Sequence, residues 1–141
     1  MKEEILKTVE YLKKGKIILY PTDTIWGIGC NATNYQAVEK VYAIKRRVES
    51  KNLIILVDSF DKIKQYIDKV PLIAHDLIKS IDTPLTIIYP NAKKLAKNVI
   101  ARDGTIAIRV VKDEFCQQVI KEFGKPVVSS SANVSGEPNP I

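Results

Sequence analysis

The alternation of short apolar runs with amphipathic helical segments constrains the fold of this chain more than any other feature of its sequence. Helical spacing of apolar residues predicts helices over residues 3–14, 35–46, 59–66, 71–80 and 113–123. Runs of apolar and β-branched residues predict strands over residues 16–20, 25–30, 53–57, 86–89, 105–110 and 126–129. Because helices and sheet must bury their apolar faces against each other, we expect a sheet covered by helices.

Local end signals support several of these boundaries. Thr33-Asn34-Tyr35-Gln36 fits a capping box and predicts that a helix begins at residue 35. Ser59 is a good N-cap for the helix over 59–66. Gly15 and Gly124 follow two of the other helices, as is typical of helix C-termini.

The length of 141 residues, with 45% hydrophobic side chains, indicates a single domain over 1–141. Residues 137–141 complete no helix or strand, so we expect a shortened chain or a piece of a longer protein.

Positive charge is concentrated in two regions of the chain. Residues 40–51 hold five cations against one acid, and residues 92–112 hold six against one. Such clusters are typical of proteins that bind a nucleotide, RNA or an acidic metabolite, although a solvated basic surface would look the same in sequence. Charges near the N-terminus exclude a signal peptide, and no apolar run has membrane length, so we expect a cytoplasmic protein without a membrane partner.

Three polar stretches stand where ligands commonly bind. Thr22-Asp23-Thr24 and Ser129-Ser130-Ser131-Ala132-Asn133 each follow a predicted strand, and ligands gather beyond the carboxyl ends of strands. An ordinary turn and a flexible loop are the alternatives for these two stretches.

The third stretch, Lys45-Arg46-Arg47, lies at the end of a predicted helix. Lys45 and Arg47 can bind one ligand only if the helix unwinds between them, because residues two apart point in different directions.

Gly27-Ile28-Gly29-Cys30-Asn31-Ala32 matches the dinucleotide fingerprint Gly-x-Gly-x-x-Gly/Ala, but the glycines lie within an apolar run and not in a turn after it. We therefore interpret them as strand glycines that allow close approach of another group. Cys30 and Cys116 lack the spacing of a zinc site or a disulfide framework. No nucleophile constellation is evident, so any chemistry should depend on positioning and charge stabilisation.

Together with Pro84-Leu85-Thr86, residues 104–109 and Ser135-Gly136, these stretches resemble the YrdC-like family of L-threonylcarbamoyl-adenylate synthases over nearly the whole chain. The resemblance implies an α+β, YrdC-like fold, in which helices flank a twisted, mixed or mainly antiparallel sheet with one concave basic face. It also implies synthesis of threonylcarbamoyl-AMP and pyrophosphate from L-threonine, bicarbonate and ATP, with Mg²⁺ accompanying ATP. Downstream threonylcarbamoyl-transferase proteins would then transfer the group to adenosine in transfer RNA.

The resemblance also assigns roles to individual residues. The catalytic residues that would bind ATP phosphates and the threonine carboxylate are Lys45 and Arg47. The residues that would hold the nucleotide, besides these two, are Ser131 and Asn133. The residues that would line the threonine end of the site are Thr22, Asp23, Thr24, Thr86 and Arg109. No residue is assigned as a direct metal ligand.

The sequence departs from the family pattern at Val48, Asn52 and Val111, where family members commonly have proline, and it lacks the family's segment beyond Ser135-Gly136. One alternative is a module of the same fold that binds double-stranded RNA or transfer RNA through the two basic regions without synthesis. Another is carbamoyl transfer in metalloenzyme maturation. Charge reversal at Lys93 and Lys94 would separate synthesis from RNA binding.

Overall fold

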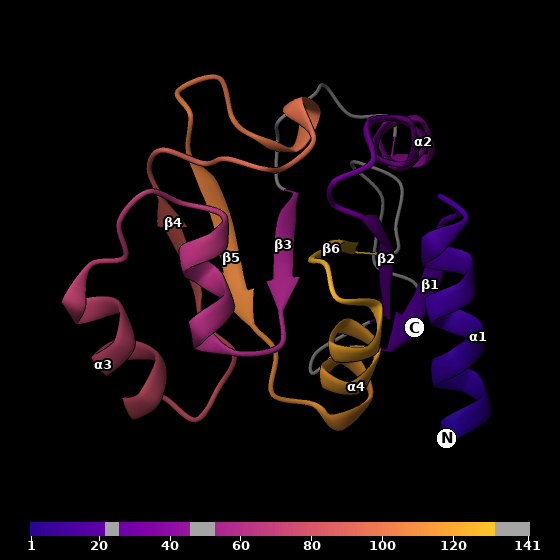
Figure 1. The fold of residues 1–141 in the computed structure, drawn as a ribbon, viewed down its shortest axis with the longest axis horizontal. Coiled ribbons are helices and arrows are strands. Elements are labelled where there is room, and N and C mark those ends of the chain that lie inside the picture. The colour runs from indigo at the N-terminus through magenta and orange to yellow at the C-terminus, as the bar shows by residue number, and fades with distance from the viewer. Residues whose placement is uncertain (22–25, 46–52, 132–141) are drawn as a thin grey trace.

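The computed structural model describes residues 1–21, 26–45 and 53–131, and its path is drawn in Figure 1. The helices are α1 (Lys2–Lys13), α2 (Tyr35–Lys45), α3 (Leu72–Ser80) and α4 (Glu114–Phe123), with 3₁₀ helices η1 (Phe60–Gln65) and η2 (Lys97–Val99). The strands are β1 (Ile18–Pro21), β2 (Trp26–Asn31), β3 (Ile54–Val57), β4 (Thr86–Tyr89), β5 (Ile106–Val110) and β6 (Val127–Ser131).

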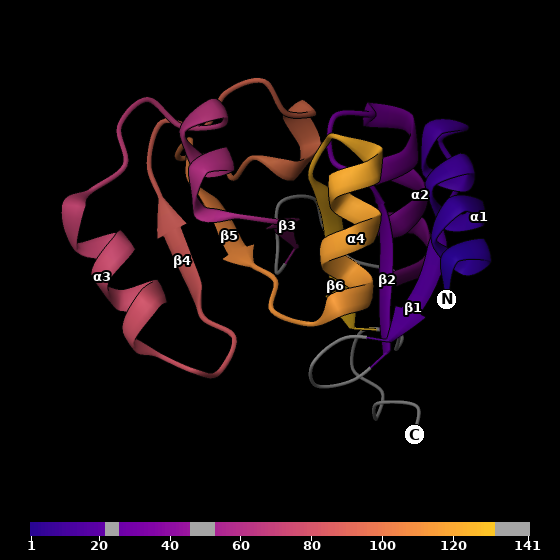
Figure 2. The same ribbon diagram turned by 60° about the horizontal axis from the view of Figure 1, so that its bottom comes forward.

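The six strands form one mixed sheet in the order β1-β2-β6-β3-β5-β4. The β3 and β5 strands run parallel, and the other neighbouring pairs are antiparallel. The predicted α+β class and the mixed sheet are therefore confirmed. Figure 1 and Figure 2 both show α1 and α3 at opposite sides of the molecule, with α3 beside the edge strand β4.

Alternation along the strands sends apolar side chains to two separate cores. One core joins α1 and α4 to strand residues that include Ile18, Tyr20, Leu56 and Val127. The other core joins α2 and η1 to strand residues that include Ile28, Cys30, Ile55 and Val57. Because successive side chains of a strand point to opposite faces, helices cover both faces of the sheet.

The predicted helix ends at Gly15 and Gly124 are confirmed, and Asp113 is an N-cap that the sequence patterns did not identify. The side chain of Asp113 accepts a hydrogen bond of 2.9 Å from the backbone N–H of Cys116 at the start of α4. Gly124 ends the helix with φ of 83°, in the left-handed region that glycine adopts without steric cost. Gly15 has φ of 74° after α1.

The predicted start of α2 is confirmed, but the predicted capping residue is wrong. The carbonyl Oδ1 of Asn34 accepts the N–H of Ala37 at 3.0 Å, so Asn34 is the cap. Thr33 instead donates its hydroxyl to Oδ1 of Asn31 at 2.7 Å. The end of β2 therefore engages the threonine and moves the cap one residue along the chain.

The predicted helix over 59–66 is a 3₁₀ helix, because its backbone bonds span three residues. The N–H of Lys62 donates to the carbonyl of Ser59 at 3.2 Å, and that of Tyr66 to the carbonyl of Ile63 at 2.9 Å. Ser59 stands at the N-cap position but makes no side-chain capping bond. Without a cap, this short segment keeps the tighter ladder that short helical pieces often adopt.

Gly29 lies inside β2, where the ring of Tyr20 packs directly on its backbone. A Cβ atom at this position would lie 2.7 Å from Cε1 of Tyr20 and 2.7 Å from the carbonyl oxygen of Val128. The interpretation of a strand glycine with a close neighbour is confirmed. A dinucleotide fingerprint would place this glycine in a turn between strand and helix, so the structure excludes that alternative for this stretch.

Candidate active site

Thr86 and Arg109 lie directly opposite each other on the neighbouring strands β4 and β5. The Nε–H of Arg109 donates a hydrogen bond of 2.9 Å to the hydroxyl oxygen of Thr86, and both side chains are half-buried. The structure thus brings together two residues that the resemblance places in one site, although they are 23 positions apart in sequence. This bond fixes the Arg109 side chain through Nε and leaves its two terminal nitrogens to bind another group.

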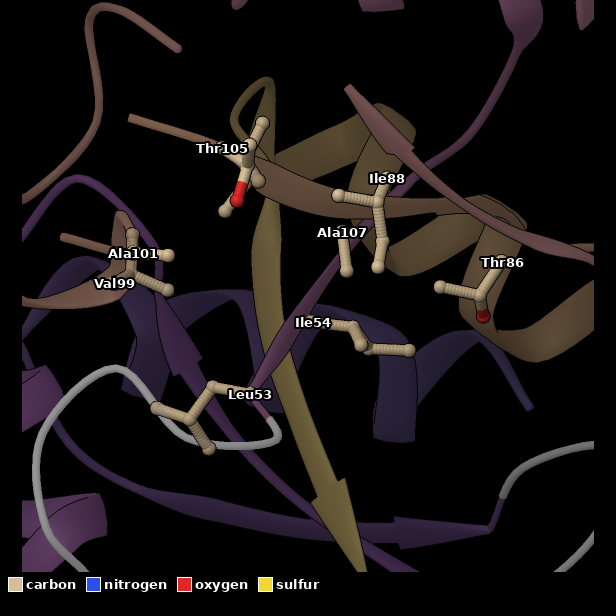
Figure 3. Close-up of a pocket in the computed structure, with 9 residues that line it drawn as sticks. Leu53, Ile54, Thr86, Ile88, Val99, Ala101, Thr105 and Ala107 are labelled. Carbon is tan, nitrogen blue, oxygen red and sulfur yellow. The ribbon is translucent and has the colours of Figure 1, made fainter. Parts of the chain in front are cut away.

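Thr86 of this pair lines a pocket with a volume of about 330 Å³, which Figure 3 shows. Its lining is apolar except for two threonine side chains, and it consists of Leu53, Ile54, Thr86, Ile88, Val99, Ala101, Thr105, Ile106 and Ala107. In Figure 3, Val99 and Ala101 lie on one side of the pocket and Thr86 on the other. An apolar cavity of this size with a few polar groups is typical of a small-molecule site.

The strand register explains why the pocket is open to solvent. Thr86 and Ile88 of β4 pair with Arg109 and Ala107 of β5, so these four side chains share one face of the sheet. Helices α1 and α4 pack over the part of this face formed by β1, β6 and β3. Ile88 is 68% exposed, so the β4 end of the face has no such cover.

Lys45 is the last residue of α2, and its side chain is completely buried. The sequence placed this cation at the end of a helix, as the structure does, but gave no sign of its burial. A buried ammonium group is costly unless it is paired and hydrogen-bonded. The structure describes α2 as far as Lys45, and the predicted unwinding between Lys45 and Arg47 lies outside the described residues. Arg47 lies outside the described residues, so their convergence stays a prediction.

The predicted nucleotide and threonine stretches start from neighbouring strand ends. Ser131, the last residue of β6, pairs with Gly27 of β2, and Pro21 pairs with Trp26 where β1 meets β2. β1 and β6 both pair antiparallel with β2, which lies between them, so the chain leaves both strands at the same end of the sheet. The predicted site residues that lie outside the described part of the chain are Thr22, Asp23, Thr24, Arg47 and Asn133.

Sequence reasoning missed the pocket residues that come from the connection between β4 and β5. Val99 and Ala101 lie in a segment without periodicity, and only its basic composition was noted. Thr105 belongs to the stretch that carries the family resemblance, and that was the one available signal. Its hydroxyl donates to Oδ1 of Asp103 at 2.7 Å, and the hydrogen bonds from Thr105 lower the pKa of that carboxyl.

Among the residues that the structure describes, no group of three or more His, Cys, Asp or Glu side chains could hold a metal ion. Within the same residues, no helix is long and apolar enough to cross a membrane. Cys30 and Cys116 are buried thiols, and burial raises the pKa of Cys30 to about 12. The chemistry of the described site is therefore that of an arginine fork, hydroxyl groups and an apolar pocket.

A family model for Sua5, YciO and YrdC, described as telomere recombination, matches residues 10–141. The chain belongs to the Sua5/YciO/YrdC family. This result confirms the resemblance drawn from the polar stretches. The matched region includes the paired strands β4 and β5, which carry Thr86 and Arg109.

Members of the Sua5/YciO/YrdC family resemble the chain in sequence and in structure. A protein of Pseudoalteromonas translucida named threonylcarbamoyl-AMP synthase is 38% identical over 136 residues, which cover 94% of this chain and 73% of that protein. The crystal structure of P. abyssi Sua5 complexed with L-threonine has a TM-score of 0.92 at 28% identity, and E. coli YciO has 0.84 at 26% identity. The matches cover 99% and 97% of this chain, but 42% of the Sua5 chain and 67% of the YciO chain.

Proposed function

We propose that this chain is a threonylcarbamoyl-AMP synthase, which converts L-threonine, bicarbonate and ATP into threonylcarbamoyl-AMP and pyrophosphate. The observation that carries the proposal is the bond from Arg109 to Thr86, a residue that lines an apolar pocket, within the Sua5/YciO/YrdC fold. Relatives that share most of the chain bear the synthase name, and this favours synthesis over the RNA-binding alternative.

Arg109 binds the carboxylate of L-threonine in this proposal. The hydrogen bond from its Nε–H to Thr86 holds the guanidinium plane in place. The terminal nitrogens then present two parallel donors, an arrangement that matches a carboxylate. Because the arginine is oriented before the substrate arrives, less side-chain entropy is lost on binding.

The apolar side of the pocket takes the adenine ring of ATP. Leu53, Val99 and Ala101 provide surfaces without charge, which suit a flat ring with apolar faces. Ser131 lies at the end of the sheet where the nucleotide stretch begins, and we assign the ribose and phosphates to that stretch. Lys45 and Arg47 neutralise the charge of the triphosphate. Mg²⁺ binds together with the triphosphate, which is a common way for proteins to bind this ion.

The reaction needs alignment more than a side-chain nucleophile. The amine of threonine takes up the carbon of bicarbonate, with loss of water, to give a carbamate. A carbamate oxygen then forms a bond to the α-phosphorus while the bond from that phosphorus to the β-phosphate oxygen breaks, and pyrophosphate leaves. Cations that neutralise the phosphates and a fixed threonine carboxylate supply the charge stabilisation and the orientation.

The product is a mixed anhydride of a carbamate and a phosphate, so it is an activated group donor. We propose that downstream transferase proteins pass its threonylcarbamoyl group to adenosine in transfer RNA, in the cytoplasm where ATP and transfer RNA occur. Direct contact between this chain and RNA is not required for that role.

The test measures pyrophosphate release from ATP with Mg²⁺ and bicarbonate, with and without L-threonine. We expect threonine-dependent release, reduced about 10- to 150-fold in Arg109→Ala, since a hydrogen bond to a charged group contributes about 1.5–3 kcal/mol. Arg102→Ala is the matched control, because Arg102 is exposed and does not line the pocket. Release that does not depend on threonine, or that survives in Arg109→Ala, would contradict the proposal.

A further inference from the structure

We propose that Asn98 is a positioning residue that holds one wall of the pocket against the helix that carries Lys45. Asn98 belongs to η2, and the next residue along the chain, Val99, lines the pocket. Asn98 does not line the pocket itself, so it acts through the wall that it holds. The effect of Asn98 on catalysis rests on the proposed function. The effect of Asn98 on ATP binding can be measured without turnover.

Three hydrogen bonds join Asn98 to α2. Its Nδ2 donates to the backbone carbonyl of Tyr35 at 3.1 Å and to Oε1 of Glu39 at 3.3 Å. The hydroxyl of Tyr42 donates to the backbone carbonyl of Asn98 at 2.7 Å. The Asn98 and Tyr42 side chains are each only 4% exposed, so water does not compete freely for these bonds.

We call this contact the Asn98 clamp, and it consists of Asn98, Tyr35, Glu39 and Tyr42. The clamp fixes part of the irregular connection between β4 and β5 to α2. The connection between β4 and β5 has no strand of its own to fix its position. Just before the clamp, the N–H of Ala96 donates to the carbonyl of Ala32 at 3.0 Å. The bonds of the clamp join the wall to α2, and the N–H of Ala101 also donates to the carbonyl of Thr105 at 2.9 Å, which ties the wall to the start of β5.

Helix α2 also carries Lys45, the residue that we propose binds the ATP phosphates. Tyr42 precedes Lys45 by three residues, so the two lie on adjacent turns of one face of α2. Val99 and Ala101 follow the clamp and form the apolar wall. The clamp therefore sets the spacing between the pocket that takes adenine and the cation that takes the phosphates.

We expect loss of the clamp to weaken ATP binding while the chemical step is preserved. Tyr42→Phe removes one hydroxyl, and Asn98→Ala removes the bonds to Tyr35 and Glu39. We expect Tyr42→Phe to raise the dissociation constant and KM for ATP about fivefold, since one hydrogen bond contributes about 1 kcal/mol, and Asn98→Ala to raise them about 30-fold, since it removes two bonds. The KM for L-threonine and kcat should stay within about twofold, because the wall contacts the nucleotide alone.

Two matched variants separate positioning from a general loss of stability. Asp113→Ala removes a side-chain bond of 2.9 Å to the backbone N–H of Cys116, which belongs to the other core. Gln117→Ala removes a bond of 2.9 Å from a side chain to the carbonyl of Val111, away from the pocket. Both should leave ATP binding unchanged. Glu39→Gln keeps an oxygen acceptor for Asn98 and should behave as the original chain does.

Calorimetric titration with ATP and steady-state pyrophosphate release decide the outcome for the full chain. Weaker ATP binding in both clamp variants, and in neither control, supports the clamp. Unchanged ATP binding with a lower urea midpoint overturns it, because the bonds would then be structural only. If the original chain binds ATP but shows no threonine-dependent release, the proposed synthase is wrong while the titration still tests the clamp. If the original chain binds no ATP, the clamp has no such role.

Discussion

Substitution of Gly29 by alanine tests the packing on which the nucleotide and threonine stretches depend. The added Cβ would approach Cε1 of Tyr20 and the carbonyl oxygen of Val128 to 2.7 Å each, and Cγ1 of Val127 to 3.1 Å. The carbonyl belongs to the neighbouring strand β6 and cannot turn aside as a flexible side chain can. Relief of the contact must therefore separate β2 from β6 or displace the tyrosine ring.

The cost follows from two opposed terms. Added bulk in a packed core costs about 1–3 kcal/mol, and two contacts this short place Gly29→Ala at the upper end of that range. Replacement of glycine in a strand returns about 0.5–1 kcal/mol, because alanine loses less conformational entropy on folding. We therefore expect Gly29→Ala to lower the free energy of unfolding by about 2 kcal/mol.

Urea denaturation followed by circular dichroism measures this change. The Tyr20→Leu background supplies the control, because leucine has no ring atom over Gly29. In that background the cost of Gly29→Ala should fall by about half, and the difference is the coupling energy between the two positions. A Gly29→Ala variant with a midpoint equal to or above that of the original chain would refute the steric argument.

Three further predictions concern stability and charge. Burial raises the pKa of Cys30 from 9.0 to about 12, so the stability that the neutral thiol contributes should be complete below pH 9 and lost as the pH rises toward 12. Across that window, the urea midpoint of Cys30→Ala should fall less steeply than that of the original chain. Asp113→Ala removes the cap on the N–H of Cys116 and should cost about 1 kcal/mol by thermal denaturation. Lys93→Glu with Lys94→Glu should leave threonine-dependent pyrophosphate release unchanged, whereas the RNA-binding alternative predicts that this variant loses RNA binding.

Local signals in the sequence determined the elements well. Strand and helix positions followed from periodicity, and Gly124 marks the end of α4 as its chemistry predicts. The cap at α2 was assigned one residue early, because the sequence does not show that Asn31 binds the hydroxyl of Thr33. That bond depends on how β2 ends, which is a matter of tertiary structure.

Non-local features of the site required the structure. The bond between Arg109 and Thr86 arises from the register of β4 against β5, and register between strands joined by a long connection cannot be read from periodicity. The wall formed by Val99 and Ala101 comes from an irregular segment, for which propensity gives no position. The burial of Lys45 depends on the chain packed around α2, and a lysine after apolar residues gives no sign of it.

The most direct test of the synthase proposal follows carbon from bicarbonate into the product. The chain is incubated with Mg-ATP, ¹⁴C-bicarbonate and L-threonine, and the nucleotides are separated and identified by mass spectrometry. The account predicts one new species that contains AMP, threonine and the labelled carbon, and its absence when threonine is left out. A species that contains AMP and threonine without the label would indicate direct adenylation of the amino acid, and it would contradict the account.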